Sequence, residues 1–407
     1  MFINIFFFAY TKAYSTEGKI KAGGWAKNTF SLIDYSSINK DTNSDNKTAK
    51  KNNSCIRFTI FDQINNELSF DFAYEISSFY GSHAQKGIFA NTRAVNYRAY
   101  DLHREIHSST HEHYNLLFYQ QIDRTCLTFS SDRFDLYAGR QTITFGSSRF
   151  INPMDVLSPF SFDTIDKEER TGVDAIRVRI PFGFMGEIDG GVVLGDHLKS
   201  QLSALYLNTK FSIKETDYAF MTMIFRENLL IGADFQTSIM DAGSWMEAAY
   251  TFSGATSDLN SDDNYLRVST GVDYNLFANL YVFLEYHYND AGGSSPKNYL
   301  KLFDKTAYSE GQVFLLSRHY LISGLLGTLT PLCTLQTNII INLSDGSFFI
   351  SPRLEYSLIE NFYLDIGAFI NIGVKTRSSD SQSGISELGS EFGNYPNIYF
   401  TSLRYYF

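Results

Sequence analysis

Charged side chains recur at every second position of several otherwise apolar segments. Arg177 and Arg179 stand two residues apart in such a segment, and Glu187 and Asp189 do so in the next. In an extended strand, alternate side chains point to opposite faces, so this spacing puts the charges on one face and the apolar residues on the other. The pattern predicts a charged lining, which would act on ions and polar solutes by attraction and repulsion.

Four of the eight histidines are clustered in the segment DLHREIHSSTHEHY, at His103, His107, His111 and His113. If this segment were helical, His103 and His107 would share a face at the i, i+4 spacing of a divalent-metal site. The order H-R-E-I-H differs from the H-E-x-x-H of zinc proteases, which excludes that catalytic site. We interpret the segment as a surface loop and predict no metal site.

Two segments carry the D-x-N-x-D pattern of calcium loops, starting at Asp41 and Asp258. Their sixth positions hold Asn46 and Asp263 instead of Gly, and neither twelfth position is a bidentate acid. We interpret both as solvated loops. The sequence also lacks a nucleophile elbow, a phosphate-binding loop and a dinucleotide fingerprint, so we predict neither an enzyme nor a cofactor.

The composition indicates a folded chain rich in strand-forming residues. Of the 407 residues, 44% are apolar, 19% charged and 16% aromatic, with 36 Phe and 27 Tyr, which excludes a disordered chain. The net charge is −10 and the Lys and Arg residues are scattered, which argues against a nucleic-acid partner. Three distant cysteines without a CxxC pair indicate neither a disulfide scaffold nor a zinc site.

The alternation of period two extends over most of the chain. We count eighteen such segments, from 18–32 to 397–407, many of them roughly 10 residues long, as transmembrane strands are. No apolar run reaches the roughly 18 residues of a transmembrane helix. The predicted fold class is all-β, a transmembrane antiparallel up-and-down β-barrel of about eighteen strands.

The connections between these segments alternate in length. Short turns at 65–66, 130–132, 215–216 and 359–361 fall at one end of the predicted strands, and long connections at 33–53, 80–112, 147–170, 290–318 and 374–396 fall at the other. Outer-membrane barrels have short periplasmic turns and longer external loops. Residues 96–112 either hold a short extra strand or extend the next one.

The position of charges decides which face is the lumen, because a buried Arg or Lys on the lipid face costs about 2–4 kcal/mol. One strand departs from this rule, because Arg140 falls on the same face as apolar residues. A β-bulge at Gly139 is a candidate explanation. The residues predicted to line the pore are Arg177, Arg179, Glu187, Asp189, Lys210, Asp234, Glu247, Arg267, Asp273, Glu285, Arg353, Glu355, Asp365 and Arg404.

The two ends of the chain indicate export and assembly. Residues 1–15 contain an apolar core followed by a small-x-small site and resemble most of a secretory signal peptide, although the positive region is missing. Residues 16–407 then form a single barrel. The last segment alternates and stops on an aromatic residue, so Tyr405 and Phe407 resemble the C-terminal assembly signal of bacterial outer-membrane barrels.

The 147–170 connection is the candidate constriction loop. It contains Pro153 and Pro159 and ends in a charged run. Folded into the barrel, it would place that run opposite Arg177 and Arg179 and create a field across the pore; the alternative is an exposed loop with solvated charges. The run consists of Asp166, Lys167, Glu168, Glu169 and Arg170.

A family resemblance is carried by the segment 139–183. Its Gly139, Arg140 and Gln141, its Asn152 and Pro153, and its later Arg170, Gly172 and Asp174 resemble large porin-like barrels of Gram-negative bacteria, including the alginate-export type. The closing stretch SEFGNYPNIYFTSLRYYF is similar to the last loop and strand of that group. The resemblance implies an outer-membrane channel, but the mixed charge of the predicted lining differs from the basic lining of alginate exporters.

These observations predict an outer-membrane porin that passes small hydrophilic or anionic solutes down their gradient. The expected partners are outer-membrane lipid, lipopolysaccharide, the barrel-assembly machinery and the solutes, and the sequence indicates no oligomeric state. Two alternatives stay open: a structural or adhesive barrel plugged by its 80–112 and 290–318 loops, and an outer-membrane hydrolase whose Ser, His and acid meet only in space.

Overall fold

The computed structural model describes residues 20–35, 48–82, 97–100, 104–110, 114–159, 162–165, 169–257, 263–375 and 387–407. Within these residues almost all regular structure is extended. The strands are β1 (Ile20–Asp34), β2 (Thr48–Gln63), β3 (Leu68–Ser82), β4 (Arg104–Thr110), β5 (Tyr114–Ser130), β6 (Asp135–Gln141), β7 (Val173–Phe182), β8 (Gly186–Val193), β9 (Ala204–Ile213), β10 (Thr216–Phe225), β11 (Asn228–Ile239), β12 (Ala242–Phe252), β13 (Tyr265–Phe277), β14 (Leu280–Asn289), β15 (His319–Thr330), β16 (Cys333–Asn342), β17 (Phe348–Ile359), β18 (Phe362–Ile372) and β19 (Asn397–Tyr406).

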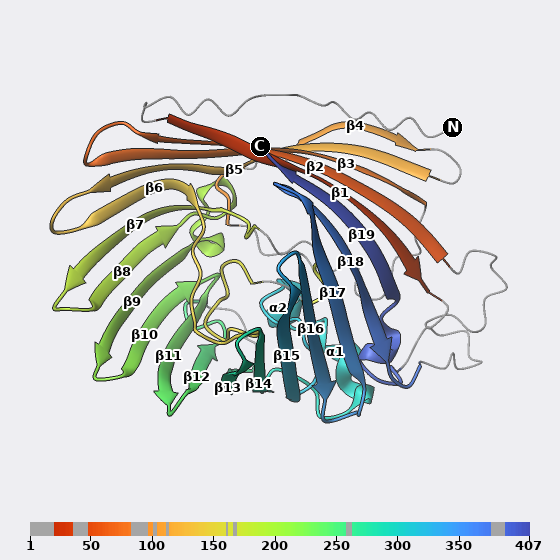
Figure 1. Cartoon of the computed structure of the whole chain (residues 1–407). Coiled ribbons are helices and arrows are strands. Elements are labelled where there is room, and N and C mark those ends of the chain that lie inside the picture. Colours follow the sequence, from red (N-terminus) through yellow and green to blue (C-terminus); the bar gives the residue numbers. More distant parts are fainter. Residues whose placement is uncertain are drawn as a thin grey trace.

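The strands form one closed antiparallel ring (Figure 1). Each ring strand pairs with the next, and β1 closes the ring by pairing with both β2 and β19. β4 is the exception, because it pairs only with the half of β5 that β6 does not reach. Of the nineteen strands described, eighteen therefore make the ring. The predicted barrel of about eighteen strands is confirmed, and 96–112 does hold a short extra strand.

Short turns and long connections lie at opposite ends of the ring, as predicted. The turns at one end include residues 64–67, 131–134, 214–215 and 360–361, and two of them use left-handed backbone at Lys214 and Asn361. The 290–318 connection at the other end carries two short helices, α1 (Tyr299–Leu302) and α2 (Thr306–Ser309). No helix among the described residues has the length and apolarity to cross a membrane.

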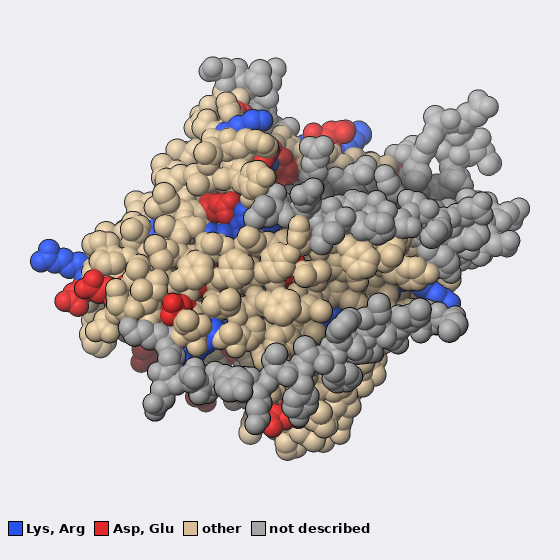
Figure 2. Space-filling model, turned by 90° about the horizontal axis from the view of Figure 1, so that it is seen from above, with Lys and Arg blue, Asp and Glu red and all other residues tan. Residues whose placement is uncertain are grey.

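The two faces of the strands differ as the alternation predicts. On β9, Leu205 and Leu207 are more than half exposed, whereas Tyr206 and Asn208 between and beside them are buried. Large apolar side chains are exposed in the same way on most strands of the ring, and the face shown in Figure 2 is largely free of charged residues. An outward apolar band of this kind matches the hydrocarbon of a bilayer.

The inner face is not uniformly polar, because connections fold against it and form apolar clusters. One cluster joins Ile143, Phe145 and Met154 to Met221 and Phe225 of β10. A second surrounds Phe162, whose ring lies 5.1 Å from that of Phe349 on β17. A third is formed by the 290–318 connection together with Tyr265 of β13 and Leu388. Burial of these apolar side chains therefore holds three connections inside or across the ring.

The strand in which Arg140 shares parity with apolar residues is β6. Gly139 has a φ of 118°, and Arg140 after it is buried, with its guanidinium 2.7 Å from Asp174. β6 keeps a continuous register with both neighbours, so the predicted bulge at Gly139 is wrong. The register shift is in β5, where Asp123 has no partner residue on β3. Glycine tolerates this positive φ, which residues with a side chain rarely adopt.

Closure of the ring requires a residue without a side chain at Gly24. Its N–H and C=O exchange hydrogen bonds of 2.9 Å with Phe407, and a Cβ added there would lie 2.1 Å from the Arg57 carbonyl oxygen. We expect Gly24→Ala to lower the free energy of unfolding by about 1–3 kcal/mol, the usual cost of overpacking. Denaturant unfolding of the refolded barrel measures this.

Gly327→Ala is the matched control, because a Cβ there meets its nearest atom, Leu280 Cδ1, at 3.4 Å, an ordinary van der Waals contact. We expect its unfolding midpoint to stay close to that of the wild type. Equal midpoints for the two variants would contradict the close-packing argument.

Candidate functional site: the constriction of the barrel lumen

The connection between β6 and β7 runs inside the ring and crosses to the far wall (Figure 1). The Ser147 hydroxyl donates a 2.5 Å hydrogen bond to Asp234 on β11, and the Arg149 guanidinium lies 2.7 Å from Asp273 on β13. Further along, Phe162 packs on β17. The described part of 147–170 thus contacts inward side chains of β11, β13 and β17, and its role as a constriction loop stays a prediction.

Glu285 on β14 anchors the start of this loop. Its two carboxylate oxygens accept backbone N–H bonds from Arg149, Phe150 and Ile151, at 2.9, 3.2 and 3.0 Å, and a fourth bond of 3.2 Å from the Trp245 indole. The side chain is completely buried. Because no cation of the described residues pairs with Glu285, these four N–H groups compensate for its desolvation.

Glu247 on β12 makes a second anchor of the same kind. It accepts backbone N–H bonds from Met154 at 2.8 Å and Ser148 at 3.3 Å, and a bond from the Asn152 side-chain amide at 3.2 Å. It is also completely buried. The two carboxylates together hold both ends of the short stretch 148–154 against the wall.

These contacts correct part of the predicted pore lining. Asp234, Glu247 and Glu285 point inward as the alternation predicts, but the loop covers them, so they do not face water. Arg267 is covered too, since its guanidinium donates to the carbonyl oxygens of Pro153 and Gln312. Sequence parity identifies the inward face, whereas the path of a loop decides which inward residues stay accessible.

Inward charges on the other walls are mostly paired with one another. Arg177 holds Asp189 in a two-point contact of 2.8 and 2.5 Å, and Arg179 lies 3.6 Å from Glu187. On β17 to β19, Arg353 pairs with Asp365 at 2.9 Å and Arg404 with Glu355 at 2.6 Å. Lys210 is exposed on β9. The lining is therefore mixed in sign, and pairing weakens the field of each charge.

The charged end of the loop reaches a different wall from the one predicted. Glu169 lies 3.6 Å from Arg57 on β2 and 3.5 Å from Arg124 on β5, while Arg177 and Arg179 are engaged on β8. The prediction that Glu169 lies opposite Arg177 and Arg179 is therefore wrong. The loop crosses the lumen before it returns to β7, which brings Glu169 to the wall of β2 and β5. Arg170 pairs with Asp155 inside the loop itself. Asp166, Lys167 and Glu168 lie outside the described residues.

Arg57 is the centre of a charge cluster that the sequence analysis missed. It bonds to Glu75 on β3 at 2.5 Å and to Asp123 on β5 at 2.8 Å, and Arg124 also binds Asp123. All four side chains are nearly or completely buried. The alternation of β2 could have indicated Arg57, but Asp123 lies at the register shift of β5, where a count by parity fails.

A second connection is fixed by Glu391, next to the turn Phe392–Asn394. Its carboxylate accepts bonds from the Tyr320 hydroxyl at 2.5 Å, the Asn342 amide at 2.8 Å and the Leu316 backbone N–H at 2.9 Å. Burial raises the pKa of Glu391 to about 8. The 374–396 and 290–318 connections are thereby tied to β15 and β16.

The alternatives with reactive chemistry find little support in the described residues. Residues 104–110 form the strand β4, so the interpretation of this segment as a loop is wrong for these residues, and the helix that a metal site at His103 and His107 would need is not formed there. His103, His111, His113 and both D-x-N-x-D cores lie outside the described residues. Within the described part of the chain, no three His, Cys, Asp or Glu side chains are grouped to hold a metal.

One serine and one histidine do meet, on neighbouring strands. The Ser269 hydroxyl lies 2.9 Å from His287 Nδ1, but it also donates a 2.7 Å bond to the Ile151 carbonyl oxygen. Both side chains are buried beneath the loop. A nucleophile needs access to its substrate, so this pair does not provide the hydrolase site that the sequence analysis left open.

Comparisons with known proteins identify the fold. No protein-family model matches the chain, and no curated protein matches it either. Among solved structures, a BenF-like porin from Pseudomonas fluorescens Pf-5 aligns with a TM-score of 0.56 and 8% identity over 95% of this chain and 98% of that chain. Acinetobacter baumannii OccAB4 aligns with a TM-score of 0.55 and 8% identity over 96% and 98%.

The outer membrane protein OprD from Pseudomonas aeruginosa is similar as well, with a TM-score of 0.53 and 8% identity over 97% of this chain and 95% of that chain. These likenesses extend over whole chains and show the fold, a closed porin-like barrel of eighteen strands. They support the porin-like part of the predicted resemblance and lend no support to its alginate-export part.

The Glu285 anchor predicts a measurable change in hydrogen exchange. In Glu285→Gln the amide NH₂ replaces an oxygen that accepts only N–H groups, so at least one bond is lost whichever way the amide points. We expect the N–H groups of Arg149, Phe150 and Ile151 to exchange at least about tenfold faster. Exchange mass spectrometry of the folded barrel measures this.

Glu187→Gln is the control for the same chemical change at a carboxylate that pairs with Arg179 of the neighbouring strand. In this variant the N–H groups of residues 149–151 should exchange at the wild-type rate. If Glu285→Gln leaves the exchange at 149–151 unchanged, the carboxylate does not anchor the loop.

The raised pKa of Glu391 predicts a pH dependence of stability. Because the folded state favours the protonated carboxyl, its contribution is fully present below the ordinary pKa of 4.5 and is lost as the pH rises through about 8. The difference in unfolding free energy between wild type and Glu391→Gln should therefore change between pH 5 and 9 and be constant outside this range. A pH-independent difference in denaturant midpoints would contradict it.

Proposed function

We propose that this protein is an outer-membrane porin that passes small hydrophilic or anionic solutes passively. The observation that carries the proposal is the closed eighteen-strand ring, apolar outside and charged inside, with one connection folded across its lumen. A ring of this size is too wide to be filled by its own side chains. The structural neighbours are porins, which supports the same function and an outer-membrane location.

Selectivity would arise at the level of the 147–170 loop. Arg149, which is about one-third exposed, lies over the Trp245 ring at 4.9 Å and pairs with Asp273. The paired charges Arg177 with Asp189, Arg353 with Asp365, and Arg404 with Glu355 line the remaining wall. Rings of charge and the width of the constriction govern which solutes pass such a pore. The proposal assigns no cofactor and no catalytic residue.

The proposed partners follow from the outer surface and the last strand. The outward apolar band would contact outer-membrane lipid and lipopolysaccharide. Tyr405 is exposed on the outer face, and the Phe407 ring lies 5.9 Å from that of Phe58 across the closing strands. Their position at the seam supports a role for Tyr405 and Phe407 as a signal for the barrel-assembly machinery.

A plugged structural or adhesive barrel is the second candidate, and the three apolar clusters favour it. They show that connections occupy part of the lumen. An open channel conducts ions, whereas a plugged barrel does not, so a measurement of ion conductance distinguishes the two.

We expect stable open steps in single-channel recordings of the refolded barrel in a planar bilayer. The reversal potential in a salt gradient should be small, because the inward charges are mostly paired. Correct insertion is checked independently by the slower migration of the unfolded chain after heating. A properly inserted barrel that stays closed at all voltages would contradict the porin and favour the plugged barrel.

A further inference from the structure

Glu391 joins two long connections and one turn of the barrel at a single buried point. Its carboxylate accepts bonds from Tyr320 on β15, Asn342 on β16 and the backbone N–H of Leu316 in the 290–318 connection. Its own backbone N–H donates a 2.8 Å bond to Asp345 in the turn between β16 and β17. The 290–318 and 374–396 connections and this turn therefore meet at a pair of carboxylates.

The two carboxylates share a donor and lack a cation. The Asn342 amide nitrogen lies 2.8 Å from one oxygen of Glu391 and 3.1 Å from one oxygen of Asp345. None of the ion pairs formed by the described residues includes either carboxylate. Since Glu391 is completely buried, a charge on it is costly and is repelled by Asp345.

The groups around Glu391 favour its neutral form at neutral pH. Burial, to which the charge of Asp345 adds, raises the pKa of Glu391 to about 8. A raised pKa means that the folded arrangement is stable while the carboxyl is protonated and weakens as the pH rises through about 8. The other titratable groups that face Glu391 are Asp345, Tyr320, Tyr299 of α1, Tyr308 of α2 and Tyr395; Asp163 in turn faces Tyr395, and Arg267 faces Tyr308.

The residues that follow Glu391 hold the far part of the 147–170 loop. The rings of Phe392 and Tyr395 lie 5.6 and 5.3 Å from the ring of Phe162. Phe162 also contacts Phe349 on β17, at 5.1 Å, and all of these rings are buried. Two of the three ring contacts of Phe162 therefore depend on the segment that Glu391 fixes.

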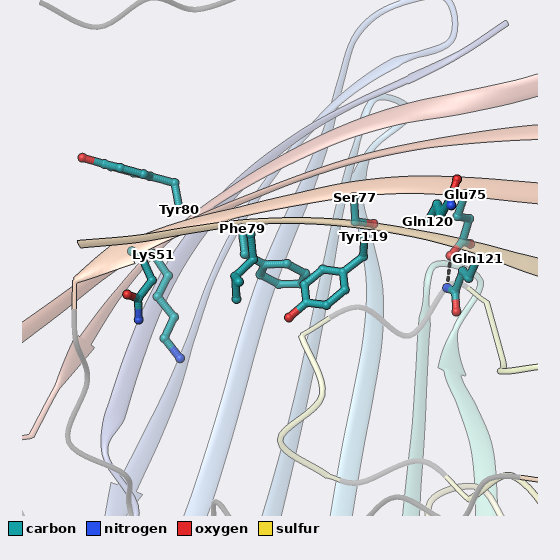
Figure 3. Close-up of a pocket in the computed structure, with 11 residues that line it drawn as sticks. Lys51, Glu75, Ser77, Phe79, Tyr80, Tyr119, Gln120 and Gln121 are labelled. Carbon is teal, nitrogen blue, oxygen red and sulfur yellow. Dashed lines mark hydrogen bonds between the residues drawn. The ribbon is translucent and has the colours of Figure 1, made fainter. Parts of the chain in front are cut away.

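The lumen has space for a released loop. A pocket of about 620 Å³ lies on the inner face of β2, β3 and β5, where the Phe79 and Tyr119 rings point inward (Figure 3). The end of the loop already reaches this wall, since Glu75 lines the pocket and binds Arg57, which lies 3.6 Å from Glu169. Movement of the loop into this space narrows the open part of the lumen.

We propose that Glu391 is a pH-sensitive switch of the channel. With its carboxyl neutral, the 374–396 connection holds Phe162 against β17 and the pore stays open. When the carboxyl loses its proton to water, the connection and the loop are released and the pore closes for part of the time. The inference rests on the proposed channel and on the 147–170 loop as its constriction, and it adds a regulation to that function.

Single-channel recordings of the refolded barrel between pH 6 and pH 9.5 test the proposal. From pH 7 to pH 9 the charged fraction of a group with a pKa of about 8 rises about tenfold, so the fraction of time spent closed should rise about tenfold too. Glu391→Gln keeps a neutral side chain and should stay open over the whole range. Phe162→Ala removes the ring contacts and should show frequent closures already at pH 7, with no further change at pH 9.

Glu310→Gln is the matched control, because Glu310 lies in the same 290–318 connection but pairs with Arg226 at 3.6 Å. It should keep the pH response of the wild type. Equal closed fractions at pH 7 and pH 9 in the wild type, or a response that persists in Glu391→Gln, would overturn the switch and leave the open channel intact. A barrel that stays closed at every pH refutes the proposed function and the switch with it.

Discussion

The structure depends on one constraint, which is that every strand must find a partner on both sides. In a bilayer there is no water to bond to an open edge, and each unsatisfied backbone group costs several kcal/mol. The seam between β1 and β19 meets this constraint with ten residue pairs and with the two hydrogen bonds between Gly24 and Phe407. The extra strand β4 shows the same requirement locally, since it pairs with the part of β5 that the short β6 leaves uncovered.

Once the ring is closed, its inside is a space that its own side chains do not fill. The protein uses its connections to shape this space. Glu247 and Glu285 are central here, because each places a buried carboxylate where several N–H groups of the 147–170 loop converge. A charge without a cationic partner would be costly to bury, so the loop and the carboxylate stabilise each other only in this position. The constriction is thereby held by charge-assisted bonds as well as by apolar contacts.

Most charged side chains that line the remaining lumen form neutral pairs. Pairs such as Arg177 with Asp189 give a polar wall without a strong local field, which suits the passage of diverse hydrophilic solutes.

The sequence by itself determined the fold class, the number of ring strands, the ends at which turns and long connections lie, and the inward face of almost every strand. These properties follow from alternation and segment length, which are local and repeat along the chain. The sequence also offered a short extra strand within 96–112 as one of two options. The assignment failed at Asp123, where a register shift in β5 breaks the period on which the count relies.

Only the tertiary structure decided what the inward residues do. Glu285 and Asp365 look alike in the sequence, yet Glu285 binds backbone N–H groups of the 147–170 loop, whereas Asp365 binds Arg353 on the neighbouring strand β17. Glu169 meets Arg57 and not Arg177, although Arg177 is far closer along the chain. The reason is that a long connection has no period of its own, so its path depends on contacts with distant strands that form only when the ring closes.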